Sequence, residues 1–167
     1  MTRWSVALLI CSDRAAQGAR ADASADLLRP ALTAASFDLS RIVVVADERS
    51  AIEDRLRDLA NEHAVVLTSG GTGVSPRDVT VEATLAVIDK EVPGIGEAMR
   101  QKSLLSTPMA MLSRATAGVR GGALIVNLPG SPRGSLECLE VVLPVLAHAL
   151  RAIRGEVKDC KEDLQRA

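Results

Sequence analysis

Short runs of consecutive apolar residues alternate with longer amphipathic segments along this 167-residue chain. An apolar run without polar alternation is typical of a strand that is covered on both faces, and its alternation with helical segments is typical of a mainly parallel sheet. The pattern predicts strands at 6–11, 41–46, 64–68 and 123–128, and helices at 23–35, 51–61, 81–89 and 97–105. A stripe of leucines from Leu136 to Leu150 predicts a long final helix that ends at Gly155.

The pair Gly121-Gly122 separates two apolar segments, 111–120 and 123–128, and is a signal for a two-residue hairpin. One antiparallel strand is therefore expected in an otherwise parallel sheet. Ser50 and Glu53 have capping-box spacing, and Thr80 is a candidate N-cap of the third helix. Pro30 is expected to kink or split the first helix, and Pro144 to bend the last.

The composition fits one domain and excludes several classes of function. Only 1% of the residues are aromatic and the net charge is −1, so neither base stacking nor a basic field favours nucleic acid. The first apolar run is too short for a signal peptide or a membrane span. The three cysteines form no zinc pattern and fit a reducing cytoplasm. We expect a cytoplasmic protein with one domain at 1–155 and a charged tail at 156–167.

Two turns rich in small residues follow predicted strands. The first spans residues 69–73 (Ser-Gly-Gly-Thr-Gly) and the second spans 129–132 (Pro-Gly-Ser-Pro). Ligands of open α/β sheets bind beyond the carboxyl ends of the strands, where peptide N–H groups and helix N-termini attract phosphate. A purely structural tight turn remains an alternative for the first. The second is also a helix start, with Ser131 as N-cap and Pro132 at the first position.

Two carboxylates are expected near the same edge of the sheet. Asp47 follows the second predicted strand, and Asp78 precedes the third predicted helix. Two carboxylates beside a phosphate-binding turn suit Mg²⁺, which is usually held by one or two carboxylates and by substrate phosphates. The spacing does not exclude the alternative that Asp47 is a turn residue and that Asp78 complements a helix dipole.

The segment Ser12-Asp13-Arg14 at the end of the first strand would place a hydroxyl, a carboxylate and a guanidinium on that edge. Further cations stand at predicted loop positions: Arg77, Lys102, Arg114 and Arg133. Each of them, taken singly, is more often a solvated surface residue than a ligand-binding one.

In combination and in this order, the motifs resemble the MogA/MoaB family over about residues 5–155. The segments that carry the resemblance are 12–14, 68–73 with 76–80, 93–94 before 99–101, 111–114 and 127–132. The same domain occurs in larger molybdopterin-handling and CinA-like proteins. A match of all these segments in order is far more specific than any one of them.

The resemblance implies adenylyl transfer from Mg·ATP to the terminal phosphate of molybdopterin, with pyrophosphate as the second product. It implies a three-layer α/β/α sandwich that forms homotrimers, or hexamers in MoaB-type members, with a molybdenum-insertion protein as a candidate partner. The family's catalytic and metal-binding aspartates correspond to Asp47 and Asp78. The substrate- and nucleotide-binding residues would be Ser12, Asp13, Arg14, Ser69, Gly70, Gly71, Thr72, Gly73, Ser103, Ser113, Pro129, Gly130 and Ser131.

The implied chemistry agrees with what the sequence lacks. The nucleophile is the substrate's own phosphate, so neither a Ser-His nor a Cys-His pair is needed, and catalysis rests on positioning and charge neutralisation. Two other functions stay open at this point. One is a non-catalytic MoaB-like paralogue that binds a pterin, and the other is a CinA-like nucleotide hydrolase.

Overall fold

The computed structural model describes residues 3–18 and 23–157. The strands are β1 (Trp4–Cys11), β2 (Phe37–Val45), β3 (Val65–Ser69), β4 (Lys90–Glu91), β5 (Ala117–Arg120) and β6 (Ala123–Leu128). The helices are α1 (Asp13–Ala16), α2 (Ser24–Ala34), α3 (Arg49–Glu62), α4 (Thr80–Val87), α5 (Pro93–Leu104), the 3₁₀ helix η1 (Pro108–Leu112) and α6 (Pro132–Ile153). Residues 158–167, most of the predicted charged tail, lie outside the described residues.

The described strands form one sheet in the order β2-β1-β3-β6-β5-β4. The pairs β1–β2, β1–β3 and β3–β6 are parallel, whereas β5 is antiparallel to both of its neighbours. The turn between β5 and β6 contains Gly121, whose φ of 53° suits glycine. The predicted α/β fold, with a mainly parallel sheet and one antiparallel strand from a hairpin, is confirmed.

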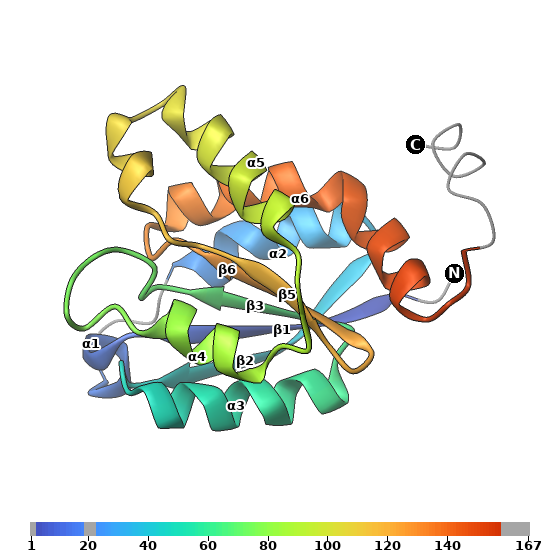
Figure 1. The fold of residues 1–167 in the computed structure, drawn as a ribbon, viewed down its shortest axis with the longest axis horizontal. Helices are drawn as coiled ribbons and strands as arrows, with labels where there is room; N and C mark the ends of the chain where they lie inside the picture. The colour runs from blue at the N-terminus through green and yellow to red at the C-terminus, as the bar shows by residue number, and fades with distance from the viewer. Residues whose placement is uncertain (1–2, 19–22, 158–167) are drawn as a thin grey trace.

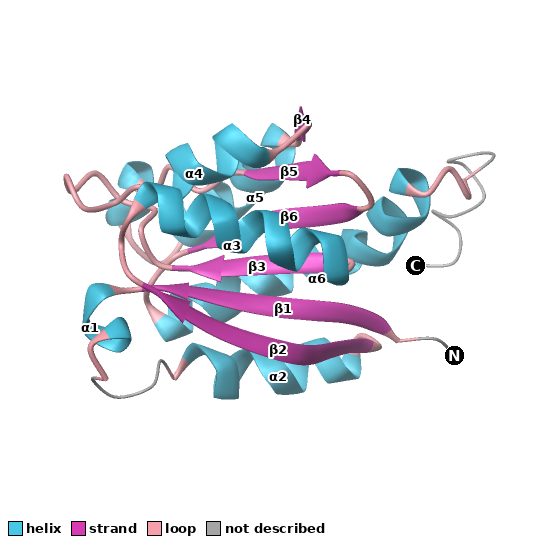
Figure 2. Ribbon diagram, turned by 90° about the horizontal axis from the view of Figure 1, so that it is seen from below, coloured by secondary structure: helices cyan, strands magenta, loops and turns pink. Residues whose placement is uncertain are grey.

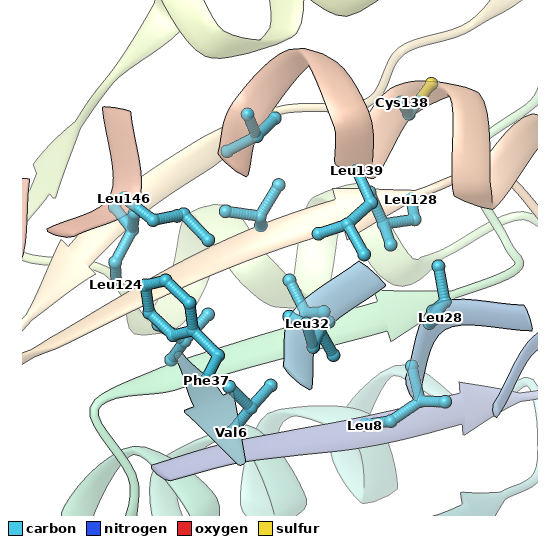
Figure 3. Packing of buried hydrophobic residues seen from close by; sticks show 14 of the residues in the cluster. Val6, Leu8, Leu28, Leu32, Phe37, Leu124, Leu128, Cys138, Leu139 and Leu146 are labelled. Atoms are coloured by element: carbon cyan, nitrogen blue, oxygen red, sulfur yellow. The ribbon is translucent and has the colours of Figure 1, made fainter. Parts of the chain in front are cut away.

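Helices cover both faces of the sheet (Figures 1 and 2). Alternate residues of β1 point to opposite faces because a strand has a period of two. Val6, Leu8 and Ile10 pack with α2, α5 and α6 in one core, and Figure 3 shows part of this cluster. Ala7 and Leu9 pack with α3 and α4 in a second core on the other face. The molecule therefore has the three-layer arrangement.

Several predicted helix starts are wrong. Helix α3 begins at Arg49, so Ser50 lies inside its first turn, and Glu53 pairs with Arg49 and Arg57 rather than closing a capping box. Thr80 is the first residue of α4 rather than its N-cap, and its amide donates to Gly71 O at 3.2 Å. In both cases a tertiary or side-chain contact sets the start, rather than the local capping preference.

Other predictions differ in extent. Strand β2 begins at Phe37, four residues before its predicted start, and the short strand β4 was not predicted. Residues 111–112 belong to η1, so the strand before the hairpin begins only at Ala117. Helix α2 continues through Pro30, and α6 continues through Pro144. The cap at Ser131, which accepts from Gly134 N, and the end of α6 before Gly155 (φ 71°) are as predicted.

The carboxyl ends of β1, β2, β3 and β6 meet at one edge of the sheet, on the left of Figure 1. The turns and side chains that the sequence singles out follow these strand ends. None of the helices in the described ranges is both long enough and apolar enough to span a membrane.

Candidate functional site

The glycine turn, residues 69–73, follows β3 and is anchored to three other elements. Gly70 and Gly71 have φ angles of 102° and 66°, which side chains rarely adopt. A Cβ on Gly70 would lie 2.4 Å from Cys11 O, and one on Gly71 would lie 2.1 Å from the Thr80 hydroxyl. The Gly70 amide donates to Leu128 O at 3.3 Å. The turn thus packs tightly against β1, α4 and β6, and both positions require glycine.

The second turn, residues 129–132, lies directly against the glycine turn. A Cβ on Gly130 would lie 3.3 Å from the Gly70 Cα atom. The Ser69 side chain is buried and contacts the Ser24 hydroxyl and the Pro129 carbonyl, so it joins elements rather than facing solvent. Ser131 caps α6. The N-terminus of α6 and the glycine turn therefore lie side by side, as a site for phosphate requires.

Asp13, Asp47, Asp78 and the Arg77 side chain form what we call the acidic rim. Asp13 N donates to Asp47 Oδ2 at 3.1 Å, and Asp47 N donates to Asp13 Oδ1 at 3.0 Å. The Arg77 guanidinium forms an ion pair with Asp13 Oδ2. The other oxygen of Asp47, Oδ1, is buried and has no hydrogen-bond partner in the described part of the chain. This reciprocal pairing fixes the Asp47 carboxylate and leaves one oxygen for a ligand.

The two paired carboxylates have opposite pKa shifts. Burial raises the pKa of Asp47, with further raising by the charges of Asp13 and Asp78, while the Asp13 amide opposes the shift. The hydrogen bond from the Asp47 amide, followed by that from Arg77, lowers the pKa of Asp13. A cation bound at Asp47 would relieve this penalty on its charged form.

Asp78 is held at the end of an exposed loop that leaves the glycine turn. Its Oδ2 accepts from Ser75 N at 2.8 Å, and a Cβ on Gly73 would lie 2.9 Å from that oxygen. Arg114 donates to the carbonyls of Gly73 and Asp78 at 2.6 and 2.8 Å and forms an ion pair with Glu82. The structure thus brings Asp78 to the glycine turn, within electrostatic range of Asp47.

A cavity of about 560 Å³ opens beside both turns, between α5, η1 and the first turns of α6. Its lining contains hydroxyl groups, apolar side chains and two arginines, with Glu137 as a carboxylate. The lining residues are Thr72, Gly73, Met99, Arg100, Ser103, Ser106, Thr107, Met109, Ala110, Leu112, Ser113, Pro129, Ser131, Arg133, Gly134, Glu137 and Cys138. Because Gly73 both lines the cavity and contacts Asp78, the cavity and the acidic rim adjoin at the glycine turn.

The predicted site residues fall into three groups, and Ser12 and Arg14 belong to none of them. Those at the cavity are Thr72, Gly73, Ser103, Ser113, Pro129 and Ser131, and those at the rim are Asp13, Asp47 and Asp78. Gly70, Gly71, Gly130 and Ser69 shape the turns. Ser12 caps α1 by accepting from Ala15 N, and Arg14 is exposed. Of the four cations, Arg77 and Arg114 bind carboxylates, Lys102 is exposed, and Arg133 lines the cavity beside Glu137.

Sequence reasoning missed three residues that shape the site. Glu82 pairs with Arg114, Arg100 donates to Ala115 O at 2.7 Å, and Glu137 lines the cavity. Glu137 stands four residues after Arg133, so helical spacing placed that pair on one face of α6. The partners of Glu82 and Arg100 come from the segment between η1 and β5, which the sequence predicted as a strand.

The two cysteines in the described ranges, Cys11 and Cys138, are buried and form no disulfide. Burial raises the pKa of the Cys11 thiol to about 12 and also raises that of Cys138, whose sulfur lies 3.7 Å from the Ser103 hydroxyl. Neither thiol is therefore activated as a nucleophile. Cys160 lies outside the described residues.

The donor atoms at the rim suit a hard cation. The described residues contain no cluster of three or more His, Cys, Asp or Glu side chains that could hold a metal. Two carboxylates, one with a buried and unpartnered oxygen, instead match the partial coordination that proteins offer Mg²⁺, which takes its remaining ligands from water and phosphate. The residues present therefore fit a magnesium ion that arrives with a phosphorylated substrate.

Comparison with known proteins gives similarities along most of the chain. The family described as a probable molybdopterin binding domain matches residues 7–148. The molybdopterin adenylyltransferase of Helicobacter pylori strain J99 is 40% identical over 163 residues, which cover 94% of this chain and 92% of the relative. That of Escherichia coli K12 is 45% identical over 147 residues, covering 85% and 75%.

Among solved structures, the molybdopterin biosynthesis enzyme MoaB from Thermus thermophilus superimposes with a TM-score of 0.85 at 47% identity. The superposition covers 91% of this chain and 97% of that one. The family match at residues 7–148 includes the glycine turn, the acidic rim and every residue that lines the cavity.

Proposed function

This chain belongs to the family of probable molybdopterin binding domains, and from that membership we propose that it is a molybdopterin adenylyltransferase. A terminal phosphate oxygen of molybdopterin attacks the α-phosphorus of ATP and forms a new P–O bond. The bond between the α-phosphorus and the oxygen that bridges to the β-phosphorus breaks, and pyrophosphate leaves. The product is adenylyl-molybdopterin, in which a diphosphate joins the two parts.

The chain's contribution is to bring two anions together. The peptide amides of residues 71–73 and the N-terminus of α6, capped by Ser131, would offer donors and partial positive charge to phosphate oxygens. Positioning two bound reactants supplies a large share of the rate acceleration in such a reaction. The adjoining cavity, with Thr72, Ser103 and Ser113 in its lining, has room for a bicyclic ring system and hydroxyl groups to orient it.

Asp47 and Asp78 would hold the magnesium ion of Mg·ATP, which neutralises phosphate charge when it is bound. Asp13 keeps Asp47 in place through the reciprocal hydrogen bonds, and Arg77 holds the second oxygen of Asp13. In this proposal Asp13 acts through Asp47 rather than on the substrate.

We also propose that the protein is a cytoplasmic homotrimer, with a hexamer as the alternative, and that it passes its product to a molybdenum-insertion protein. Exposed apolar side chains at the end of α5 and in η1 support a protein interface there: Leu104, Leu105, Met109 and Met111. Sedimentation equilibrium would give three or six copies per particle, whereas a monomer would contradict the proposal.

The observation that carries the proposed function is the convergence of two aspartates and a glycine turn beside a cavity, in a chain whose relatives are adenylyltransferases. The test is incubation of the purified protein with molybdopterin, Mg²⁺ and ATP, followed by mass spectrometry of the products. We expect adenylyl-molybdopterin and pyrophosphate in equal amounts, and no ATP consumption without pterin.

Two results would favour the other functions. ADP or AMP formed without pterin would indicate a nucleotide hydrolase. Tight binding of molybdopterin without any product would indicate a non-catalytic paralogue.

A further inference from the structure

We propose that Arg114 and Glu82 act as a clamp that positions the Asp78 carboxylate, an inference that rests on the proposed function for the role of Asp78. The clamp lies outside the residues that line the cavity. It joins the segment that follows η1 to the loop between the glycine turn and α4. Arg114 is in this account a positioning residue, because it acts through Asp78 and touches no reacting atom.

Arg114 holds both ends of the loop 73–78. Its Nε atom donates to Gly73 O at 2.6 Å and one terminal nitrogen donates to Asp78 O at 2.8 Å. Its own amide donates to Thr72 O at 2.9 Å, so the backbone at residue 114 binds the glycine turn as well. Arg114 therefore holds Gly73, where the loop leaves the glycine turn, and Asp78, just before α4, at a fixed separation.

The loop has little else to hold it in place. Residues 74–77 are exposed, with the Val74 side chain at 64%. The bonds of Asp78 to Ser75 are local, because they close a turn within the loop itself. The ion pair of Arg77 with Asp13 is on the solvent side, and such a pair contributes little rigidity. Together with the Thr80 amide, which donates to Gly71 O at 3.2 Å just beyond the loop, the contacts of Arg114 with the backbone therefore restrain the position of Asp78.

Glu82 orients the guanidinium and neutralises it. Its carboxylate pairs with both terminal nitrogens of Arg114, and this contact lowers the pKa of Glu82. All three guanidinium nitrogens are thus engaged by Gly73, Asp78 and Glu82. The sequence suggests Arg114 as a cation beside the phosphate site, but in this geometry it shapes the loop and offers no free charge to phosphate.

The consequence for the reaction concerns orientation rather than binding of the pterin. A displacement of about 1 Å in a group that positions reactants costs about 100-fold in rate. Loss of the clamp should lower kcat and weaken the binding of Mg²⁺, whereas the cavity residues on α5, η1 and α6 remain in place. The KM for molybdopterin should then stay within about twofold.

The test compares Arg114→Gln with Arg120→Gln. Arg120 donates to Val87 O at 2.7 Å and so anchors the opposite end of α4, which makes it a matched control for general destabilisation. We would measure amide hydrogen exchange in the ligand-free protein, the unfolding midpoint, and kcat, the half-saturating Mg²⁺ concentration and KM. Arg114→Lys, which keeps the charge without the planar fork, and Glu82→Gln complete the series.

For Arg114→Gln we expect exchange in residues 74–79 to become about tenfold faster, kcat to fall about 100-fold and the half-saturating Mg²⁺ concentration to rise. Arg114→Lys and Glu82→Gln should lie between this variant and wild type, and Arg120→Gln should alter only the unfolding midpoint. Equal changes in both arginine variants, or unchanged loop exchange in Arg114→Gln, would overturn the clamp. If the wild type forms no adenylyl-molybdopterin, the proposed function fails, while the exchange data still decide whether the clamp exists.

Discussion

The acidic rim and the cavity adjoin at the glycine turn but differ in how they are built. At the rim, the carboxylates already have fixed partners: Asp13 and Asp47 each accept from the other's backbone amide, and Asp13 pairs with the Arg77 side chain. The cavity is instead open, and the contacts among its lining residues are separate pairs, such as Arg133 with Glu137 and Ser103 with Cys138. The rim therefore holds carboxylates in fixed positions, whereas the cavity offers space lined by separate polar and apolar groups.

This difference indicates a division of roles. Fixed carboxylates are suited to holding the cation that would neutralise phosphate charge during the reaction. A roomy surface with separate hydroxyl groups is suited to recognition of a substrate. Changes at the rim should thus alter kcat, whereas changes in the cavity should alter KM.

The largest effect is expected for the two aspartates of the rim that would hold the metal. Asp47→Asn and Asp78→Asn should each lower kcat about 10²- to 10³-fold, because a ligand of the cation that would neutralise phosphate charge is lost. The exposed Asp38 on β2 provides a control, since Asp38→Asn should leave kcat unchanged. A steady-state assay of pyrophosphate release measures this, and circular dichroism confirms that the fold survives. An unchanged rate in Asp78→Asn would mean that the acidic rim does not take part in the reaction as proposed.

Asp13→Asn should have an intermediate effect. The variant loses the ion pair with Arg77 and weakens the bond to the Asp47 amide, so the Asp47 carboxylate becomes less fixed. We expect kcat to fall about tenfold with little change in the KM for molybdopterin. The same assay serves here. If only KM changed, Asp13 would contact the substrate directly, as the sequence suggests, and the rim and cavity would not be separable.

A smaller effect is expected in the cavity. Ser103→Ala should raise the KM for molybdopterin about fivefold, which corresponds to about 1 kcal/mol for one lost hydrogen bond. Its kcat should stay within about twofold of wild type. Ser50→Ala, an exposed change on α3, is the control. A fall in kcat with an unchanged KM would break the proposed division between recognition and chemistry.

The subtlest prediction concerns the order of protonation at the rim. Carbon-13 NMR of the carboxyl groups in metal-free buffer should show Asp47 titrating above the ordinary aspartate pKa of 3.8, and Asp13 below it. The Asp47→Asn variant assigns the signals. Titration of both groups at the ordinary value would mean that the reciprocal pairing does not persist in solution.

The two shifts have opposite consequences for stability. Native Asp47 holds its proton more tightly than the unfolded chain does, so its contribution to the free energy of unfolding falls as pH rises from 3.8 through its raised pKa. Asp13 contributes its full stabilisation above pH 3.8 and loses it as pH falls through its lowered pKa. The stability of Asp47→Asn relative to wild type should therefore increase as pH rises through the raised pKa of Asp47. The stability of Asp13→Asn relative to wild type should instead increase as pH falls through the lowered pKa of Asp13.

The sequence predicts the parts of this molecule that depend on local chemistry. Apolar runs identify β1, β3 and β6, and the Ser131-Pro132 pair identifies the start of α6, because strand burial and capping leave short-range signals. The two turns and both aspartates follow from their places after strands and before helices.

Long-range contacts are what the sequence does not reveal. Arg114 and Glu82 are 32 positions apart, and nothing in their spacing indicates that they pair across the site. The apolar residues Met111 and Leu112 have the pattern of a strand, yet they belong to η1, where they leave room for the cavity. Similarly, the contact of Thr80 with the glycine turn, rather than its capping preference, sets the start of α4.

The most direct test of the central claim is a crystal structure of the protein with adenylyl-molybdopterin. The diphosphate bridge should lie at the amides of residues 71–73, with Asp47 and Asp78 facing it, and the pterin should occupy the cavity beside Ser103. A diphosphate bound away from the glycine turn, with neither aspartate facing it, would contradict the account.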